Sequence, residues 1–304
     1  MPGPAAEGQW IMEFSRYCRV LLLGVVLPSA GCLGQTPPVQ MEIPAPSAVI
    51  ELGGAVADAS YCSTFSTADA RLALISKFCE FALTYQRRLP DFIAQQTITA
   101  RGAFSTKVIT AQATFRQGRE LFSNIAIDGK PVPSSGITDT LPGRMGFSST
   151  GELGSFLVDL FSSAGVAEFK FRREDTLRGL PVAIYEFQIA SAKNTFWTLR
   201  DSKGRPLRPE FRGELWLEQQ TGRPLREELE PLHLPAGTGR FASVTTIIDY
   251  VMTPVGDAGV FLLPARSETH VCVQSIPVTR MDNVITFHEY RKFAATTRIM
   301  AVTR

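Results

Sequence analysis

The chain has 304 residues, of which 44% are hydrophobic and 20% are charged. This composition is ordinary for a globular protein, and the length allows either two domains or one large β-rich domain. The formal net charge is +2, with no block of like charges. Nucleic-acid-binding domains usually present a basic face or stripe, so this charge argues against nucleic acid as a partner.

The N-terminal segment has the order of residues found in a secretory signal. Arg16 and Arg19 precede an apolar run over residues 20–27, and small residues follow at 29–31. A charged, then apolar, then small-residue order is typical of a signal peptide. The apolar run is far shorter than the ~20 residues that a membrane-spanning helix needs. We therefore predict that residues 1–32 are a signal peptide and that the protein is exported across the inner membrane.

The end of this signal leaves two modes of processing open. The sequence SAGC at residues 29–32 resembles a bacterial lipobox, in which Cys32 becomes the lipidated first residue, although serine replaces the usual leucine. Plain cleavage near Ala30 or Gly34 is the alternative. A start at Met12 would give a more conventional signal length. The prediction is a protein of the periplasm, free or anchored to the outer membrane through Cys32.

The remainder of the chain is expected to be a tether followed by one domain. Residues 33–60 are rich in Pro, Ala and Gly and lack a stable period, which is typical of a flexible linker. The domain, residues 61–304, contains three cysteines whose spacing suits neither zinc nor a dense disulfide framework. We expect Cys79 to be a buried thiol on the apolar side of a helix. A Cys62–Cys79 disulfide in an oxidising envelope is the alternative.

The first helix is predicted to begin after Thr67, which can serve as its N-cap. Pro90 ends it, because proline disfavours helical geometry in the residue before it. Between them, apolar side chains recur at helical spacing. They are Leu72, Ile75, Cys79, Ala82 and Tyr85.

From Phe92 the pattern changes to a period of two, which is typical of half-buried strands. Strands are expected over residues 91–102, 105–117 and 119–129. A loop rich in Pro, Gly and Ser then leads to a second helix over residues 151–165.

This second helix has a capping box of Ser149 and Glu152 and a stop at Gly165. Its apolar stripe consists of Leu153, Phe156, Leu157, Leu160 and Phe161.

Everything after Gly165 reads as antiparallel β structure. The expected strands and hairpins cover residues 167–172, 180–190, 194–200, 211–230, 243–252, 259–273 and 283–293. Many strands at this spacing with only two helices favour an α+β protein. We predict a curled antiparallel sheet that forms an open half-barrel, covered by two or more helices.

The sequence offers little for catalysis. His233, His270 and His288 lie in or beside strands without a second ligand at metal-binding spacing. No nucleophile elbow, phosphate-binding loop or dinucleotide fingerprint occurs. The adjacent acids Glu227 and Glu228 would point to opposite faces of a strand, so they cannot share a proton. We therefore predict no enzyme, no catalytic residue, no metal and no cofactor. A histidine facing an acid within a cleft would revive the enzyme hypothesis.

The hairpin GELWLEQQTGRPLREELE carries a resemblance to a known family. A strand of the form G-x-L-W-[IVL]-D-x-x-T-G-x-P-x-R is common in the outer-membrane lipoprotein carrier (LolA-like) superfamily. The matching residues here are Gly213, Leu215, Trp216, Leu217, Thr221, Gly222, Pro224 and Arg226, with Glu218 in place of the aspartate. Tyr250, Leu263 and Pro264 match the following strand pair. Segments such as LPDFIAQQT and GELGSFLVDLF most resemble an uncharacterised group of secreted bacterial proteins, over residues 68–298.

The resemblance implies an open barrel with an apolar inner face that binds, without chemistry, a lipid, an acyl chain or a lipidated protein. An apolar volume of ~300 Å³ or more is then expected beneath residues 153–164. The predicted wall residues are Phe156, Leu157, Leu160, Phe161, Phe169, Phe171, Leu215, Leu217 and Tyr250. By alternation Trp216 points the other way, toward a neighbouring strand or arginine. The alternative is a structural or protein-interaction module with a filled core and an exposed apolar patch elsewhere.

Overall fold

The computed structural model describes residues 59–102, 105–116, 119–132, 155–161, 167–191, 199–200, 206–234, 241–273 and 279–293. The predicted signal peptide, Cys32, most of the tether and the Ser149–Glu152 capping box lie outside these residues. None of the helices in the described part of the chain is long and apolar enough to cross a membrane.

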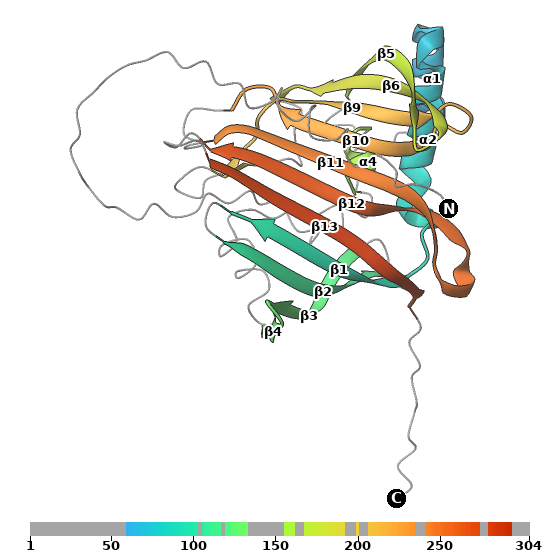
Figure 1. Cartoon of the computed structure of the whole chain (residues 1–304). Helices are drawn as coiled ribbons and strands as arrows, with labels where there is room; N and C mark the ends of the chain where they lie inside the picture. The colour runs from blue at the N-terminus through green and yellow to red at the C-terminus, as the bar shows by residue number, and fades with distance from the viewer. Residues whose placement is uncertain are drawn as a thin grey trace, which may run out of the picture.

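Eleven of the described strands form one sheet in the order β4-β3-β2-β1-β13-β12-β11-β10-β9-β6-β5. Every neighbouring pair is antiparallel. The two outermost strands do not pair with each other, so the sheet is open. Figure 1 shows it curling from β1–β4 at one end to β5, β6 and β9 at the other. The predicted half-barrel is confirmed.

The strands follow the predicted alternation closely. Their bounds are β1 Phe92–Arg101, β2 Thr106–Arg116, β3 Arg119–Ile127, β4 Lys130–Pro131, β5 Glu168–Leu177, β6 Leu180–Ile189, β9 Phe211–Glu218, β10 Pro224–Pro231, β11 Phe241–Pro254, β12 Val260–Val273 and β13 Thr279–Lys292. A separate pair is formed by β7 Leu199–Arg200 and β8 Pro206–Leu207.

The first helical region begins earlier than the sequence suggested. Helix α1 spans Ala59–Ala68, a 3₁₀ turn spans Ala70–Leu72, and α2 spans Ala73–Arg88. Thr67 therefore lies inside α1, and its predicted role as N-cap is wrong. Asp69 makes the break between α1 and α2, because its side chain accepts a hydrogen bond from the Arg71 N–H at 2.9 Å.

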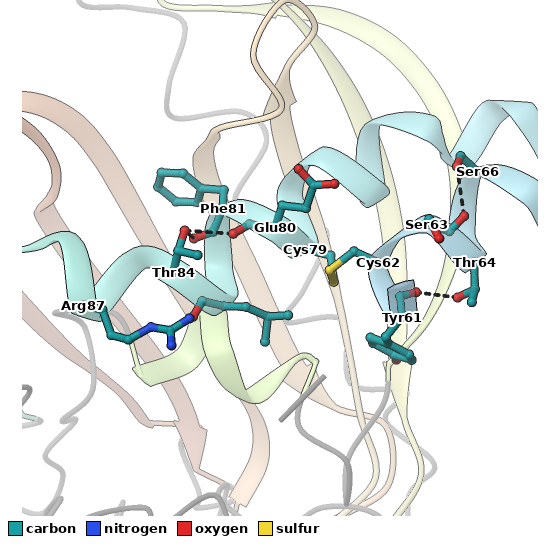
Figure 2. The surroundings of a disulfide bond; sticks show 11 residues. Tyr61, Cys62, Ser63, Thr64, Ser66, Cys79, Glu80, Phe81, Thr84 and Arg87 are labelled. Carbon is teal, nitrogen blue, oxygen red and sulfur yellow. Dashed lines mark hydrogen bonds between the residues drawn. A yellow bond between two sulfur atoms is a disulfide. The ribbon is translucent and has the colours of Figure 1, made fainter. Parts of the chain in front are cut away.

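A disulfide between Cys62 and Cys79 joins α1 to α2 (Figure 2). The two Cα atoms are 5.5 Å apart, and both residues are fully buried. The expectation of a buried thiol at Cys79 is therefore wrong, and the disulfide alternative is confirmed. The cysteines are 17 positions apart in the sequence, so the bond closes a helical hairpin that spacing alone could not establish.

Alternation along each strand divides the sheet into an inner and an outer face. Along β9, Leu215 and Leu217 are fully buried on the inner face, whereas Trp216 is half-buried on the outer face. Register shifts mark irregular pairing between Asp249 and Tyr250, opposite β12, and around Phe171, opposite β6. Such bulges strengthen the twist and bend of a sheet.

Helix α4, Ser155–Asp159, lies on the inner face with α1 and α2 and shares their core. The Phe161 ring, just after α4, lies 5.2 Å from Phe78 of α2 and 5.4 Å from Phe169 of β5, centroid to centroid. One contiguous apolar core therefore joins the helices to the inner face of the sheet.

Candidate functional site

The predicted wall residues all belong to this core. Phe156, Leu157, Leu160, Phe161, Leu215, Leu217 and Tyr250 are buried, while Phe169 and Phe171 are half-buried and pack against the others. The void that adjoins Phe156 and Leu160 measures about 10 Å³, which is roughly the space of one water molecule. The structure thus brings the nine residues into one packed core, in which Phe156 and Leu160 border this small void. Their role as a ligand-binding wall stays a prediction.

A much larger hollow lies on the other side of α2. This groove, between α2 and the β11–β12 hairpin, has a volume of about 460 Å³. It is lined by Lys77, Glu80, Phe81, Tyr85, Arg88, Leu89, Thr221, Arg223, Met252, Val260, Phe261 and Leu262. Two of its apolar side chains are conspicuously accessible, because Met252 is 47% exposed and Val260 is 57% exposed.

The local structure of the hairpin explains this exposure. After β11, a 3₁₀ turn over Gly256–Ala258 leads into Gly259, whose φ of 119° suits glycine far better than any other residue. Val255 N–H donates to the Gly259 carbonyl at 2.9 Å and closes the turn. Val255 at this turn is fully buried in the core, whereas Met252 and Val260, on the two strands beside the turn, are exposed.

A buried tyrosine of α2 forms a hydrogen bond with β12 beside the groove. The Tyr85 hydroxyl of α2 donates to the Leu262 carbonyl of β12 at 2.5 Å. Burial raises the pKa of Tyr85 well above its ordinary value. The phenol therefore stays protonated at physiological pH and can donate this hydrogen bond.

The charges around the groove are mostly positive. Lys77, Arg88 and Arg223 line it against one acid, Glu80. Within the described residues, none of the three cations forms an ion pair. The guanidinium Nη1 of Arg223 lies 3.8 Å from the Met252 Sδ, beside the exposed apolar edge. An apolar floor with a cationic rim suits an amphiphile better than a plain hydrocarbon.

Sequence reasoning did not identify this groove. The available signal was the pair Met252 and Val260, two apolar residues flanking the turn of a predicted hairpin. Only the pairing of that hairpin with α2, far away in the chain, makes them one surface.

The outer face of the sheet carries a network of ion pairs. Arg226 forms a two-point contact with Asp249, in which each nitrogen–oxygen distance is 2.9 Å. The Arg226 guanidinium also lies 6.0 Å from the Trp216 ring centroid. The prediction that Trp216 faces outward, next to an arginine, is confirmed.

Glu227 and Glu228 lie on opposite faces, as their alternation predicts. Glu227 is buried on the inner face. Burial, and next the neighbouring carboxylate of Glu214, raise the pKa of Glu228 on the outer face to about 7. The two carboxylates therefore have separate environments and cannot work as a dyad.

One histidine does face acids. His270 Nδ1 lies 2.7 Å from Asp282, and its Nε2 lies 3.4 Å from Glu268. Burial alone would lower the pKa of His270, but the bonds to Glu268 and Asp282 raise it overall. The bond from His270, and then that from Arg266, lower the pKa of Glu268 to about 2.

This arrangement resembles a salt-bridge cluster more than a reaction centre. His270 lies on the outer face and lines neither the groove nor the void beneath α4. His233 and His288 are each 3.8 Å from one acid and are largely exposed. In the described part of the chain, no three His, Cys, Asp or Glu residues could hold a metal ion.

No protein-family model matches the sequence, and no curated protein matches it. Solved structures with a related arrangement include a putative outer membrane lipoprotein-sorting protein domain from Vibrio parahaemolyticus, 12% identical, with a TM-score of 0.38 over 70% of this chain and 91% of that one. A LolA superfamily protein from Nitrosomonas europaea is 12% identical, with a TM-score of 0.33 over 72% and 93%. A DUF1329 family protein from Desulfovibrio piger is 10% identical, with a TM-score of 0.35 over 74% and 95%.

The second of these structures is described as a member of the superfamily that the hairpin motif resembles. Likenesses of this size identify neither a ligand nor a reaction.

Proposed function

We propose that the protein is a non-enzymatic component of the cell envelope that binds the apolar part of a lipid, an acyl chain or a lipidated protein. In this proposal, the binding site is the groove between α2 and the β11–β12 hairpin. The observation that carries this proposal is the exposure of Met252 and Val260 at the mouth of a hollow of about 460 Å³. Ligand pockets usually measure ~300–1,000 Å³.

The groove borders the core. Tyr85, Leu89 and Leu262 form part of its lining and are buried members of the core cluster. Burying apolar surface contributes roughly 25 cal/mol per Å², so a chain laid along Met252 and Val260 would be held without specific polar contacts. The nine predicted wall residues do not line this groove and belong to the packed core instead.

The protein-interaction alternative is favoured by a different observation. The void beneath α4 measures about 10 Å³, so the core beneath this helix is filled by its own side chains. Under this alternative the same groove receives an apolar segment of a protein without a lipid. In either case, we propose that residues 1–32 direct export and that Cys32 or a nearby cleavage site becomes the new N-terminus.

Native mass spectrometry distinguishes the two. The full chain would be exported to a bacterial periplasm, purified without detergent, and incubated with phospholipid or with an acylated peptide. We expect a bound mass that extracts into organic solvent. Val260→Glu should abolish it, because a carboxylate would lie on the apolar edge of the groove.

The matched control is Leu121→Glu on β3. Leu121 is 55% exposed, as Val260 is 57% exposed, but it does not line the groove. This variant should keep the bound mass. If the wild-type protein stays free of ligand after both incubations, the lipid proposal is wrong and the protein-interaction alternative takes its place. The intact mass of the same sample also reports whether Cys32 is acylated.

A further inference from the structure

A second hollow lies at the other end of strands β12 and β13. It has a volume of about 140 Å³ and lies where β1 turns into β2. Its lining includes Ala100, Arg101, Lys107, Thr269, Asp282 and Asn283. Along β12, Thr269 is seven residues beyond Leu262 of the groove, which is about 23 Å at the rise of an extended strand. The two hollows are therefore separate.

The floor of this cavity is polar although it faces the apolar side of the sheet. In the strand register, Asn283 of β13 lies between Thr269 of β12 and Ala100 of β1. Thr269 is paired on its other side with Thr246, and their hydroxyl oxygens are 3.0 Å apart. Asn283 is 4% exposed, and Thr269 is 2% exposed. The next inner-face residue of β13, Ile285, returns to the apolar pattern.

The side-chain oxygen of Asn283 is buried without a hydrogen bond. Its Oδ1 is inaccessible to solvent and has no hydrogen-bond partner among the described residues. Leaving such a group unpaired costs stability, and asparagine is also a poor strand residue. A hydrophobic residue would serve the fold better at this position, so the amide suggests a partner that binds there.

The charge near the cavity favours an anion. Lys107 lies opposite Ala100 in the β1–β2 register and thus on the same face as Asn283. Arg101 also lines the cavity, from the position opposite Asp282 in the β1–β13 register. Neither cation forms an ion pair within the described residues. Asp282, the one acid in the lining, is already held by Arg280 and His270, at 2.7 Å from each.

We propose that this cavity binds a small anion that carries at least one hydroxyl group. The anionic group contacts Lys107 at the mouth, with Arg101 nearby, and the hydroxyl group hydrogen-bonds the Asn283 amide on the floor once the side chain turns to bring Oδ1 to the cavity. A hydroxyl both donates and accepts, so it satisfies the amide in either orientation. A cavity of ~150 Å³ holds a benzene ring, which sets the size at about six to ten non-hydrogen atoms.

Isothermal titration calorimetry on the exported full-length protein tests this. The probes are sn-glycerol 3-phosphate, D-glycerate and glycerol, which separate a phosphate ester, a carboxylate and an uncharged polyol. Vesicles of phosphatidylglycerol, compared with phosphatidylcholine vesicles, show whether the phosphate source is a lipid headgroup. We expect at least one of the two anions to bind about tenfold or more tightly than glycerol, because glycerol lacks the charge that Lys107 attracts.

Two variants locate the binding. Asn283→Leu should weaken binding about tenfold or more, and it should raise the melting temperature of the ligand-free protein because it removes the unpaired amide. Lys107→Met should weaken the binding of the anionic probes and leave the binding of glycerol unchanged. Lys130→Met on β4 is the matched control and should bind all the probes as the wild type does.

The proposal is overturned if neither anion binds at millimolar concentration, or if Asn283→Leu and Lys107→Met both bind as tightly as Lys130→Met. Because the groove is a separate place, Val260→Glu should leave this binding unchanged.

Discussion

The outer face carries one carboxyl group whose titration should be visible in the stability of the whole protein. Glu228 lies on β10 among Glu214 of β9, Arg226 and Glu230 of its own strand, and His270 of β12. Burial and next Glu214 raise its pKa from 4.5 to about 7, although Arg226 and His270 oppose this rise. The folded protein therefore retains a proton that the unfolded chain releases, over the range between these two pKa values.

The sign and size of the effect follow from this proton. Because the folded state binds the extra proton, stability falls as the pH rises from about 4.5 to about 7. The difference between the two pKa values corresponds to about 3 kcal/mol in total, of which about 2.5 kcal/mol falls between pH 5 and pH 8. Glu228→Gln keeps the shape of the neutral acid and has no proton to lose. Relative to the wild type, it should gain about 2.5 kcal/mol of stability over that pH interval.

Urea unfolding at a series of pH values, without reductant, measures this difference. Glu230→Gln is the matched control, because Glu230 lies on the same face but forms an ion pair with Arg212 at 2.6 Å. It should show no comparable gain. A constant free-energy difference between Glu228→Gln and the wild type from pH 5 to pH 8 would refute the reasoning, since it would mean that folded Glu228 is already ionised at pH 5.

Two further predictions concern packing and the helical hairpin. In Gly213→Ala the new Cβ would overlap the backbone of β10 and the Phe187 ring, so we expect a loss of about 1–3 kcal/mol in the unfolding free energy. Gly102→Ala, where the nearest atom would be 3.7 Å away, should lose far less when both variants are unfolded in urea. Cys79→Ser breaks the bond to Cys62 across 17 residues, so it should lower the unfolding free energy by about 3 kcal/mol in urea. An unchanged midpoint would show that the disulfide contributes nothing to stability.

Several features were predictable because they depend on local alternation. The strands over residues 91–129 appear as β1, β2 and β3 because a period of two specifies an extended chain with one buried face. The same alternation placed Trp216 on the outer face and Leu215 in the core. It also separated the two neighbouring acids of β10. None of these conclusions requires knowing which other strand lies alongside.

By itself, the sequence therefore determined the order of the strands along the chain, their inner and outer faces, and the α+β class. Only the tertiary structure decided which regions of the molecule are packed with side chains and which are hollow. The hollow expected beneath α4 measures about 10 Å³, while the groove of about 460 Å³ arises where α2 meets a hairpin. Tyr85 and Leu262, which line that groove and are joined by a hydrogen bond, are 177 residues apart. Volume and unpaired polar atoms such as the Asn283 amide depend on such distant neighbours, and a local pattern carries no information about them.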